Sequence, residues 1–130
     1  MKITVITVGK LKEKFFREAV SEYEKRLGRY CKLEIRETAD EKTPDGISET
    51  ERDQILQREG ERIARLLPDS AYVVTLEIEG RKFTSESFAA EIGRLGVNGV
   101  GHVVFVIGGS LGLHNSIKRR ADLAVSFSKM

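Results

Sequence analysis

The residue types best suited to chemistry gather between residues 102 and 114, where glycines and histidines surround a short apolar run. The run is rich in Val, Ile and Phe and stops at Gly108-Gly109, with a further glycine at Gly112. Such a run predicts a fully buried strand, and the residues from His114 onward predict a helix. Ligands of open α/β folds bind outside the carboxyl ends of the strands, where glycine lets the backbone approach a ligand closely. The local sequence leaves two interpretations open, a ligand-binding loop or a tight turn without a ligand.

The spacing of these glycines differs from the motifs that bind nucleotides. Residues 108–112 have the sequence Gly-Gly-Ser-Leu-Gly, which lacks the Gly-x-Gly opening of the dinucleotide fingerprint. No Gly-Lys-Ser or Gly-Lys-Thr follows, as a Walker loop requires. The chain also has no Gly-x-Ser-x-Gly sequence for a serine nucleophile, and no carboxylate pair stands out for acid–base work.

The two histidines and the single cysteine, Cys31, show no metal-ligand spacing, so we expect no metal site. His102 opens the buried strand, and we expect it at the surface or hydrogen-bonded to a neighbour. His114 follows the glycines, and it either contacts a ligand or starts a helix beside Asn115.

Two basic clusters, residues 10–14 and residues 118–120, lie near the predicted carboxyl ends of strands. Each is interpreted either as a solvated face or as a docking surface for a phosphate backbone. The formal net charge of +2 neither demands nor excludes an RNA partner.

Composition is typical of one globular domain, because 130 residues with 40% apolar side chains are enough for a core. A single cysteine rules out an internal disulfide framework and fits a reducing compartment. The sequence begins directly with a strand and shows no signal-peptide pattern. Residues 95–117 lack charged side chains but contain six glycines, which favours a buried strand between loops over a membrane helix.

Hydrophobic periodicity predicts strands that alternate with helices. The strands are expected over residues 3–8, 32–36, 71–76, 103–107 and 123–127, and the helices over 12–28, from a cap at Ser48 to Pro68, after a cap at Thr84, and over 114–120. Alternating polarity places the second strand at a sheet edge, and residues 79–81 are expected to form a turn. The alternation predicts an α/β fold with a mostly parallel sheet of about five strands and helices on both faces.

Five segments in order resemble the ribosomal RNA large subunit methyltransferase H family. They are residues 1–12, 22–27, 75–81, 105–113 and 123–130, and together they span the whole chain. The resemblance implies the SPOUT class, whose α/β fold contains a trefoil knot. Its members are cytoplasmic homodimers that transfer a methyl group from S-adenosyl-L-methionine to N3 of a pseudouridine in the 23S rRNA of the assembled ribosome.

The same resemblance implies where the cofactor binds. The expected contacts are Leu76, Gly108, Phe127, Ser128, Lys129 and Met130, with no metal and no membrane. Leu76 and Gly108 lie at the carboxyl ends of predicted strands, in agreement with the residue-level interpretation. An adenine slot needs apolar walls and close main-chain approach, which these two residues can supply.

Family members continue after the Ser-Lys-Met sequence with a Thr-Phe-Pro-His type loop and a long amphipathic helix. By resemblance that tail threads the knot, completes the cofactor pocket and forms much of the dimer contact. We therefore expect residues 1–130 to be one α/β domain truncated at its carboxyl end, with an incomplete knot and no activity of its own. The alternatives are a non-catalytic α/β module that associates with ribosomes or other partners, and a nucleotide-binding enzyme of another doubly wound type.

Overall fold

The computed structural model describes residues 1–9, 14, 17, 18, 20, 21, 24, 25, 30–41, 43–109 and 111–127. Its elements, in order, are β1 (Lys2–Val8), β2 (Lys32–Thr38), α2 (Glu49–Leu66), β3 (Tyr72–Phe83), α3 (Ser85–Val97), β4 (His102–Ile107), α4 (Asn115–Arg120) and β5 (Leu123–Phe127). The helix expected over 12–28 falls mostly outside the described residues, but those described between 14 and 25 are helical. Among the described residues, no helix is both long and apolar enough to cross a membrane.

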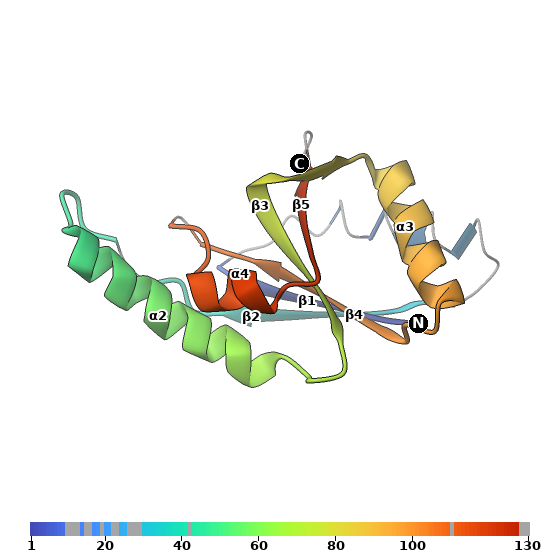
Figure 1. Ribbon diagram of the computed structural model, residues 1–130, viewed down its shortest axis with the longest axis horizontal. Coiled ribbons are helices and arrows are strands. Elements are labelled where there is room, and N and C mark those ends of the chain that lie inside the picture. The colour runs from blue at the N-terminus through green and yellow to red at the C-terminus, as the bar shows by residue number, and fades with distance from the viewer. Residues whose placement is uncertain are drawn as a thin grey trace.

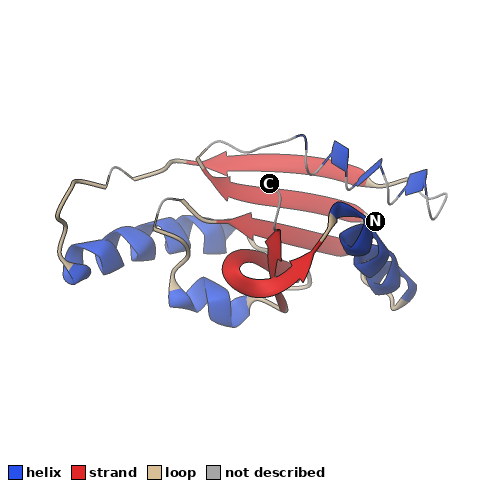
Figure 2. Cartoon of the chain, turned by 90° about the horizontal axis from the view of Figure 1, so that it is seen from above, coloured by secondary structure: helices blue, strands red, loops and turns tan. Residues whose placement is uncertain are grey.

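The described strands form one five-stranded sheet in the order β2-β1-β4-β3-β5. Every neighbouring pair is parallel, so carboxyl ends of adjacent strands meet at one edge (Figure 2). The predicted α/β class with a parallel sheet is confirmed, as is the half-exposed edge position of β2. The incomplete knot stays a prediction.

The sheet separates two apolar cores, and β4 contributes to both because side chains alternate across a strand. Val103 and Phe105 pack in the core that contains the buried face of α3. Val104 and Val106 pack in the core that contains residues of α2 and α4. Figure 1 shows α2 and α4 side by side, with α3 apart from them.

Local capping chemistry explains where the two longer helices begin. The Ser48 hydroxyl accepts a hydrogen bond from the Glu51 amide at 3.2 Å, as the sequence predicts. Thr84 and Ser87 satisfy each other's backbone amides in a capping box at the start of α3. The predicted inward face of α3 is confirmed, because all four of its members are buried: Phe88, Ala89, Ile92 and Leu95.

The turn predicted at residues 79–81 is wrong, because β3 continues to Phe83. The prediction nevertheless fell on an irregular segment, where Leu76 and Arg81 both pair with Val125 of β5. A Cβ at Gly80 would lie 2.6 Å from the carbonyl carbon of Val125. Glycine is therefore required at this position because the backbones of β3 and β5 approach too closely for any side chain.

Helix α2 carries a buried carboxyl group, Glu59, whose side chain is only 3% exposed. Its Oε2 accepts a hydrogen bond from the Glu41 amide at 3.1 Å, while its Oε1 has no partner among the described residues. Burial raises the pKa of the Glu59 carboxyl, the Glu41 amide opposes that rise, and the nearby charge of Asp40 adds to it.

We predict that Gly80→Ala lowers the free energy of unfolding by about 1–3 kcal/mol, because the new Cβ must push β5 away. Urea denaturation followed by circular dichroism measures the change. Gly101→Ala is the matched control, since nothing lies within 4 Å of a Cβ there. Equal stability of the two variants would contradict the close approach of β3 and β5.

A second prediction concerns pH. The Glu59 carboxyl has an ordinary pKa of 4.5 and a higher one when folded, so the folded protein holds the proton more tightly. The stability that this proton contributes is complete below pH 4.5 and is lost as pH rises through the folded pKa. Glu59→Gln keeps a neutral group of similar shape, so its stability relative to wild type should rise over that window.

Thermal melts between pH 4 and pH 8 test this. Glu61→Gln, an exposed change on the same helix, should leave the pH profile of wild type unaltered. Parallel profiles for wild type and Glu59→Gln would show that the pKa of Glu59 is the same in the folded and unfolded protein, which would contradict this prediction.

Candidate cofactor-binding site

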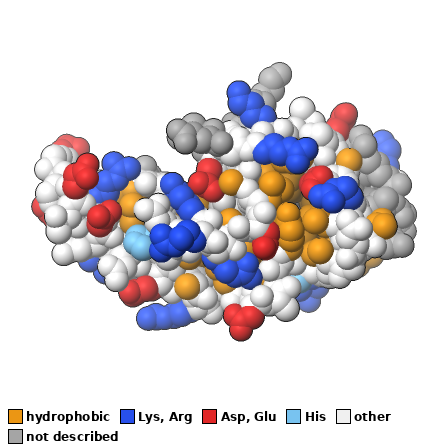
Figure 3. Space-filling model, viewed as in Figure 1, with side chains coloured by type: hydrophobic (Ala, Val, Ile, Leu, Met, Phe, Trp, Pro, Cys, Tyr) orange, Lys and Arg blue, Asp and Glu red, His pale blue; other side chains and the backbone are white. Residues whose placement is uncertain are grey.

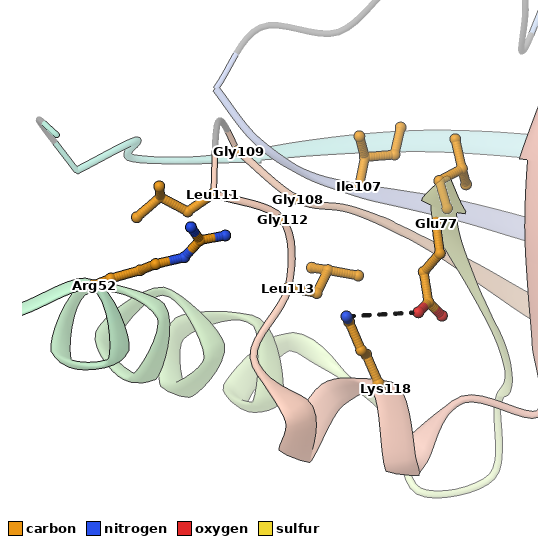
Figure 4. Close-up of a pocket in the computed structure, with 10 residues that line it drawn as sticks. Arg52, Glu77, Ile107, Gly108, Gly109, Leu111, Gly112, Leu113 and Lys118 are labelled. Carbon is orange, nitrogen blue, oxygen red and sulfur yellow. Dashed lines mark ion pairs between the residues drawn. The ribbon is translucent and has the colours of Figure 1, made fainter. Parts of the chain in front are cut away.

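A pocket of about 570 Å³ lies where the first part of β3 and the end of β4 face α2 and α4 (Figure 4). Its size is within the range of small-molecule sites. The residues that line it are Arg52, Leu76, Glu77, Ile107, Gly108, Gly109, Leu111, Gly112, Leu113 and Lys118.

Leu76 and Gly108, predicted from different parts of the sequence, line this same pocket. Leu76 comes from β3 and Gly108 follows the last residue of β4, and parallel pairing of the two strands brings them to one edge. Ile107 and Leu113 add apolar surface on the β4 side. The pocket therefore combines apolar side chains with the partly exposed backbone of Gly108 and Gly109.

The glycine loop has its shape for a reason that differs from the one expected. A Cβ at Gly108 would lie 2.4 Å from the carbonyl oxygen of Gly112, so the loop folds back on its own strand end. The Gly112 amide donates to the Gly109 carbonyl at 3.1 Å, and Gly112 has the positive φ, +86°. Gly108 is therefore needed for the turn itself. A ligand in the pocket contacts a backbone whose conformation this turn already sets.

Glu77 is a pocket residue that the sequence analysis missed. Its Oε2 accepts a hydrogen bond from the Thr75 hydroxyl at 2.6 Å, and its Oε1 lies 3.9 Å from Nζ of Lys118. Both carboxylate oxygens therefore have partners that hold the side chain at the pocket wall (Figure 4). The only signal in the sequence was a polar residue directly after the apolar part of the strand.

Arg52 was also missed, because it lies on the exposed side of α2, where arginine is unremarkable in a sequence. In Figure 4 its guanidinium extends toward Leu111 and Gly112, across the pocket from Glu77 and Ile107. Helix α2 therefore contributes a positive charge to a pocket whose other walls come from the sheet and α4.

The remaining predicted cofactor contacts are only partly described. Phe127 ends β5 and pairs with Phe83 rather than with Leu76. Ser128, Lys129 and Met130 lie outside the described residues. Their contact with a cofactor stays a prediction.

Neither histidine lines this pocket. Nε2 of His102 lies 2.8 Å from the Thr4 hydroxyl at the amino ends of β4 and β1, and burial lowers the pKa of His102. Nδ1 of His114 accepts a hydrogen bond from the Ser116 amide at 3.2 Å, so His114 caps α4. The hydrogen-bonded interpretation of His102 and the helix-start interpretation of His114 are both confirmed.

The other candidate groups have structural roles in the part of the chain that the structure describes. Burial raises the pKa of the Cys31 thiol to about 11, which makes it a poor nucleophile. Arg120 donates to the carbonyls of Pro68, Asp69 and Ala71, so of the basic cluster at 118–120 only Lys118 reaches the pocket. No group of three potential metal ligands occurs among the described residues.

S-adenosyl-L-methionine fits the chemistry of these walls. The adenine ring requires apolar surface, which Leu76, Ile107 and Leu113 offer. Gly108, Gly109 and Gly112 present main-chain donors and acceptors with no side chain of their own in front of them. The pinned carboxylate of Glu77 is compatible with the cationic sulfonium.

Known proteins resemble the chain over its whole length. A family profile described as "Predicted SPOUT methyltransferase" matches residues 1–130. Proteins named "Ribosomal RNA large subunit methyltransferase H" from Bifidobacterium adolescentis, Clostridium beijerinckii and Streptococcus suis are 58%, 51% and 50% identical to it. Each match covers 100% of this chain and 82% of the relative.

The matched residues include β3, β4 and the glycine loop, which build the pocket described above. The family profile matches every residue, and the relatives named above are at least half identical to the chain. These matches agree with a pocket whose walls suit a methyl donor. The chain belongs to the SPOUT methyltransferase family, together with the ribosomal RNA large subunit methyltransferases H.

Proposed function

We propose that this protein uses S-adenosyl-L-methionine to methylate N3 of a pseudouridine in the 23S rRNA of the assembled ribosome. The observation that carries the proposal is the pocket itself, which unites Leu76 and Gly108 in a chain of the SPOUT methyltransferase family. The names of its relatives support ribosomal RNA as the substrate. A protein of this kind acts in the cytoplasm, where ribosomes are, and we include a homodimeric state in the proposal.

In this proposal, the described residues bind and orient the cofactor and do not transfer protons. The bound cofactor supplies a methyl group on a sulfonium, which N3 accepts as its proton leaves, giving N3-methylpseudouridine and S-adenosyl-L-homocysteine. Leu76, Ile107 and Leu113 exclude water from one side of the pocket. The glycine backbone would hold the bound cofactor so that its methyl group faces the incoming nitrogen, and alignment of this kind accounts for a large part of catalysis.

In this proposal, the general base that takes the N3 proton lies in the segment of the relatives that residues 1–130 do not cover. The 130 residues cover 82% of the length of those relatives. A positioned general base contributes about 10²–10⁴-fold to the rate. Residues 1–130 then form an α/β unit that binds the cofactor and depends on the remaining segment for activity.

We predict that residues 1–130 alone transfer no detectable methyl group, whereas a full-length form, in which the carboxyl-terminal segment of a relative is appended to residue 130, does. Ribosomes that lack the modification are incubated with tritiated S-adenosyl-L-methionine, and incorporation into 23S rRNA is counted. Ribosomes that already carry the methyl group are the control. Equal rates for both forms would show that the proton acceptor lies within residues 1–130, and ribosome binding without any transfer would favour the non-catalytic module.

We also predict that Leu76→Ala in the full-length protein weakens binding of S-adenosyl-L-methionine roughly tenfold, because it removes apolar contact area from the ligand. Isothermal titration calorimetry measures the affinity, with ATP and NAD as competing ligand classes. Leu66→Ala is the matched control, since Leu66 is also partly buried but does not line the pocket. Tighter binding of ATP or NAD than of S-adenosyl-L-methionine would overturn the cofactor assignment.

A further inference from the structure

Two cations line the cofactor pocket among the described residues, and they differ in their partners. Lys118 lies 3.9 Å from the carboxylate of Glu77. Arg52 takes part in no side-chain hydrogen bond or ion pair within the described part of the chain. Its guanidinium therefore brings five unoccupied N–H donors to the rim of the pocket.

Two other arginines of α2 have partners, and Arg52 is the arginine of this helix that lines the pocket. Arg58 and Arg62 both bind the carboxylate of Glu41, at 3.1 and 2.9 Å, and fasten the loop after β2 to the helix. Arg52 lies about two to three turns earlier and is directed toward the glycine loop instead (Figure 4). Arg52 does not help to hold the loop after β2 on the helix.

A second hollow adjoins the pocket at Arg52. Its volume is about 340 Å³, and residues 43–49 line it together with Arg52 and Leu111, which both cavities share. Neither Leu76 nor Gly108 lines this second hollow. Arg52 thus lies on the boundary between the cofactor pocket and a space that continues outward along the start of α2.

The same face of the molecule carries further positive charge. Figure 3 shows Lys and Arg side chains gathered over the region of α4, while apolar side chains are uncovered between β5 and α3. Positive charge beside the pocket suits a polyanion, because neutralised phosphates release bound counterions.

We propose that Arg52 binds a backbone phosphate of the RNA strand that presents its base to this pocket, an inference that rests on the proposed function. A base that undergoes chemistry leaves its stack, and the phosphates beside it then reach the rim of the site. A planar guanidinium matches phosphate oxygens in a bidentate manner. The carboxylate of the cofactor is the other anionic source, but Arg52 lies across the pocket from Glu77, the neighbour of Leu76.

The test compares Arg52→Ala with Arg65→Ala in the full-length protein. Arg65 is an exposed arginine at the other end of α2, outside the pocket, so both changes remove one positive charge from the same helix. Fluorescence anisotropy measures binding of a labelled single-stranded RNA containing pseudouridine at several salt concentrations. Arg52→Ala should weaken binding roughly tenfold and lower the slope of log K against log salt by about 0.7.

Arg65→Ala should leave both quantities at the wild-type value, and Arg52→Lys should restore the slope because it keeps the charge. Calorimetry with S-adenosyl-L-methionine should give wild-type affinity for Arg52→Ala. An unchanged slope, or an equal loss in Arg65→Ala, overturns the proposal. Loss of cofactor affinity with an unchanged slope assigns Arg52 to the cofactor carboxylate and overturns it as well.

The outcome is separable from that of the proposed function. If wild type methylates ribosomes but Arg52→Ala keeps the wild-type slope, the phosphate contact fails and the methyltransferase stands. If wild type transfers no methyl group but the slope falls in Arg52→Ala alone, the phosphate contact stands and the proposed reaction fails.

Discussion

Strand β4 is hydrogen-bonded to a parallel strand on each side and is buried on both faces, which constrains most of the remaining structure. Four consecutive residues, Val103–Val106, are at most 1% exposed and alternate between two cores. Only the two ends of β4 are therefore free to connect to loops. At the carboxyl end, Gly108 folds the backbone directly onto Gly112, and the pocket lies beside this turn.

Features that depend on local patterns could be predicted from the sequence. Apolar runs identified the strands, and Ser48 and Thr84 marked helix starts because their hydroxyls bind backbone amides nearby in the chain. The continuation of β3 past Gly80 was not predictable, since it depends on the close approach of β5 more than 40 residues later. Local composition there is typical of a turn, and tertiary pairing overrides it.

The residues of the candidate site likewise divide into those that local patterns predicted and those that depend on tertiary packing. Leu76 and Gly108 were predicted because they lie at the ends of apolar runs and because their segments resemble a family. Glu77 and Arg52 were missed, since a glutamate and an arginine on exposed-looking positions carry no periodic signal. Their relation to the pocket arises only when α2 and α4 pack on the same face of the sheet, which no local pattern specifies.

The pairing of β1 with β4 has a consequence for how the protein is made. Ile3 and Val103 are adjacent in the sheet but about 100 residues apart in the chain. At a synthesis rate of 5–20 residues per second, the first strand waits roughly 5–20 s for its partner to leave the ribosome. During that interval a strand rich in Val and Ile has one edge without its final neighbour, the kind of edge that other chains can join.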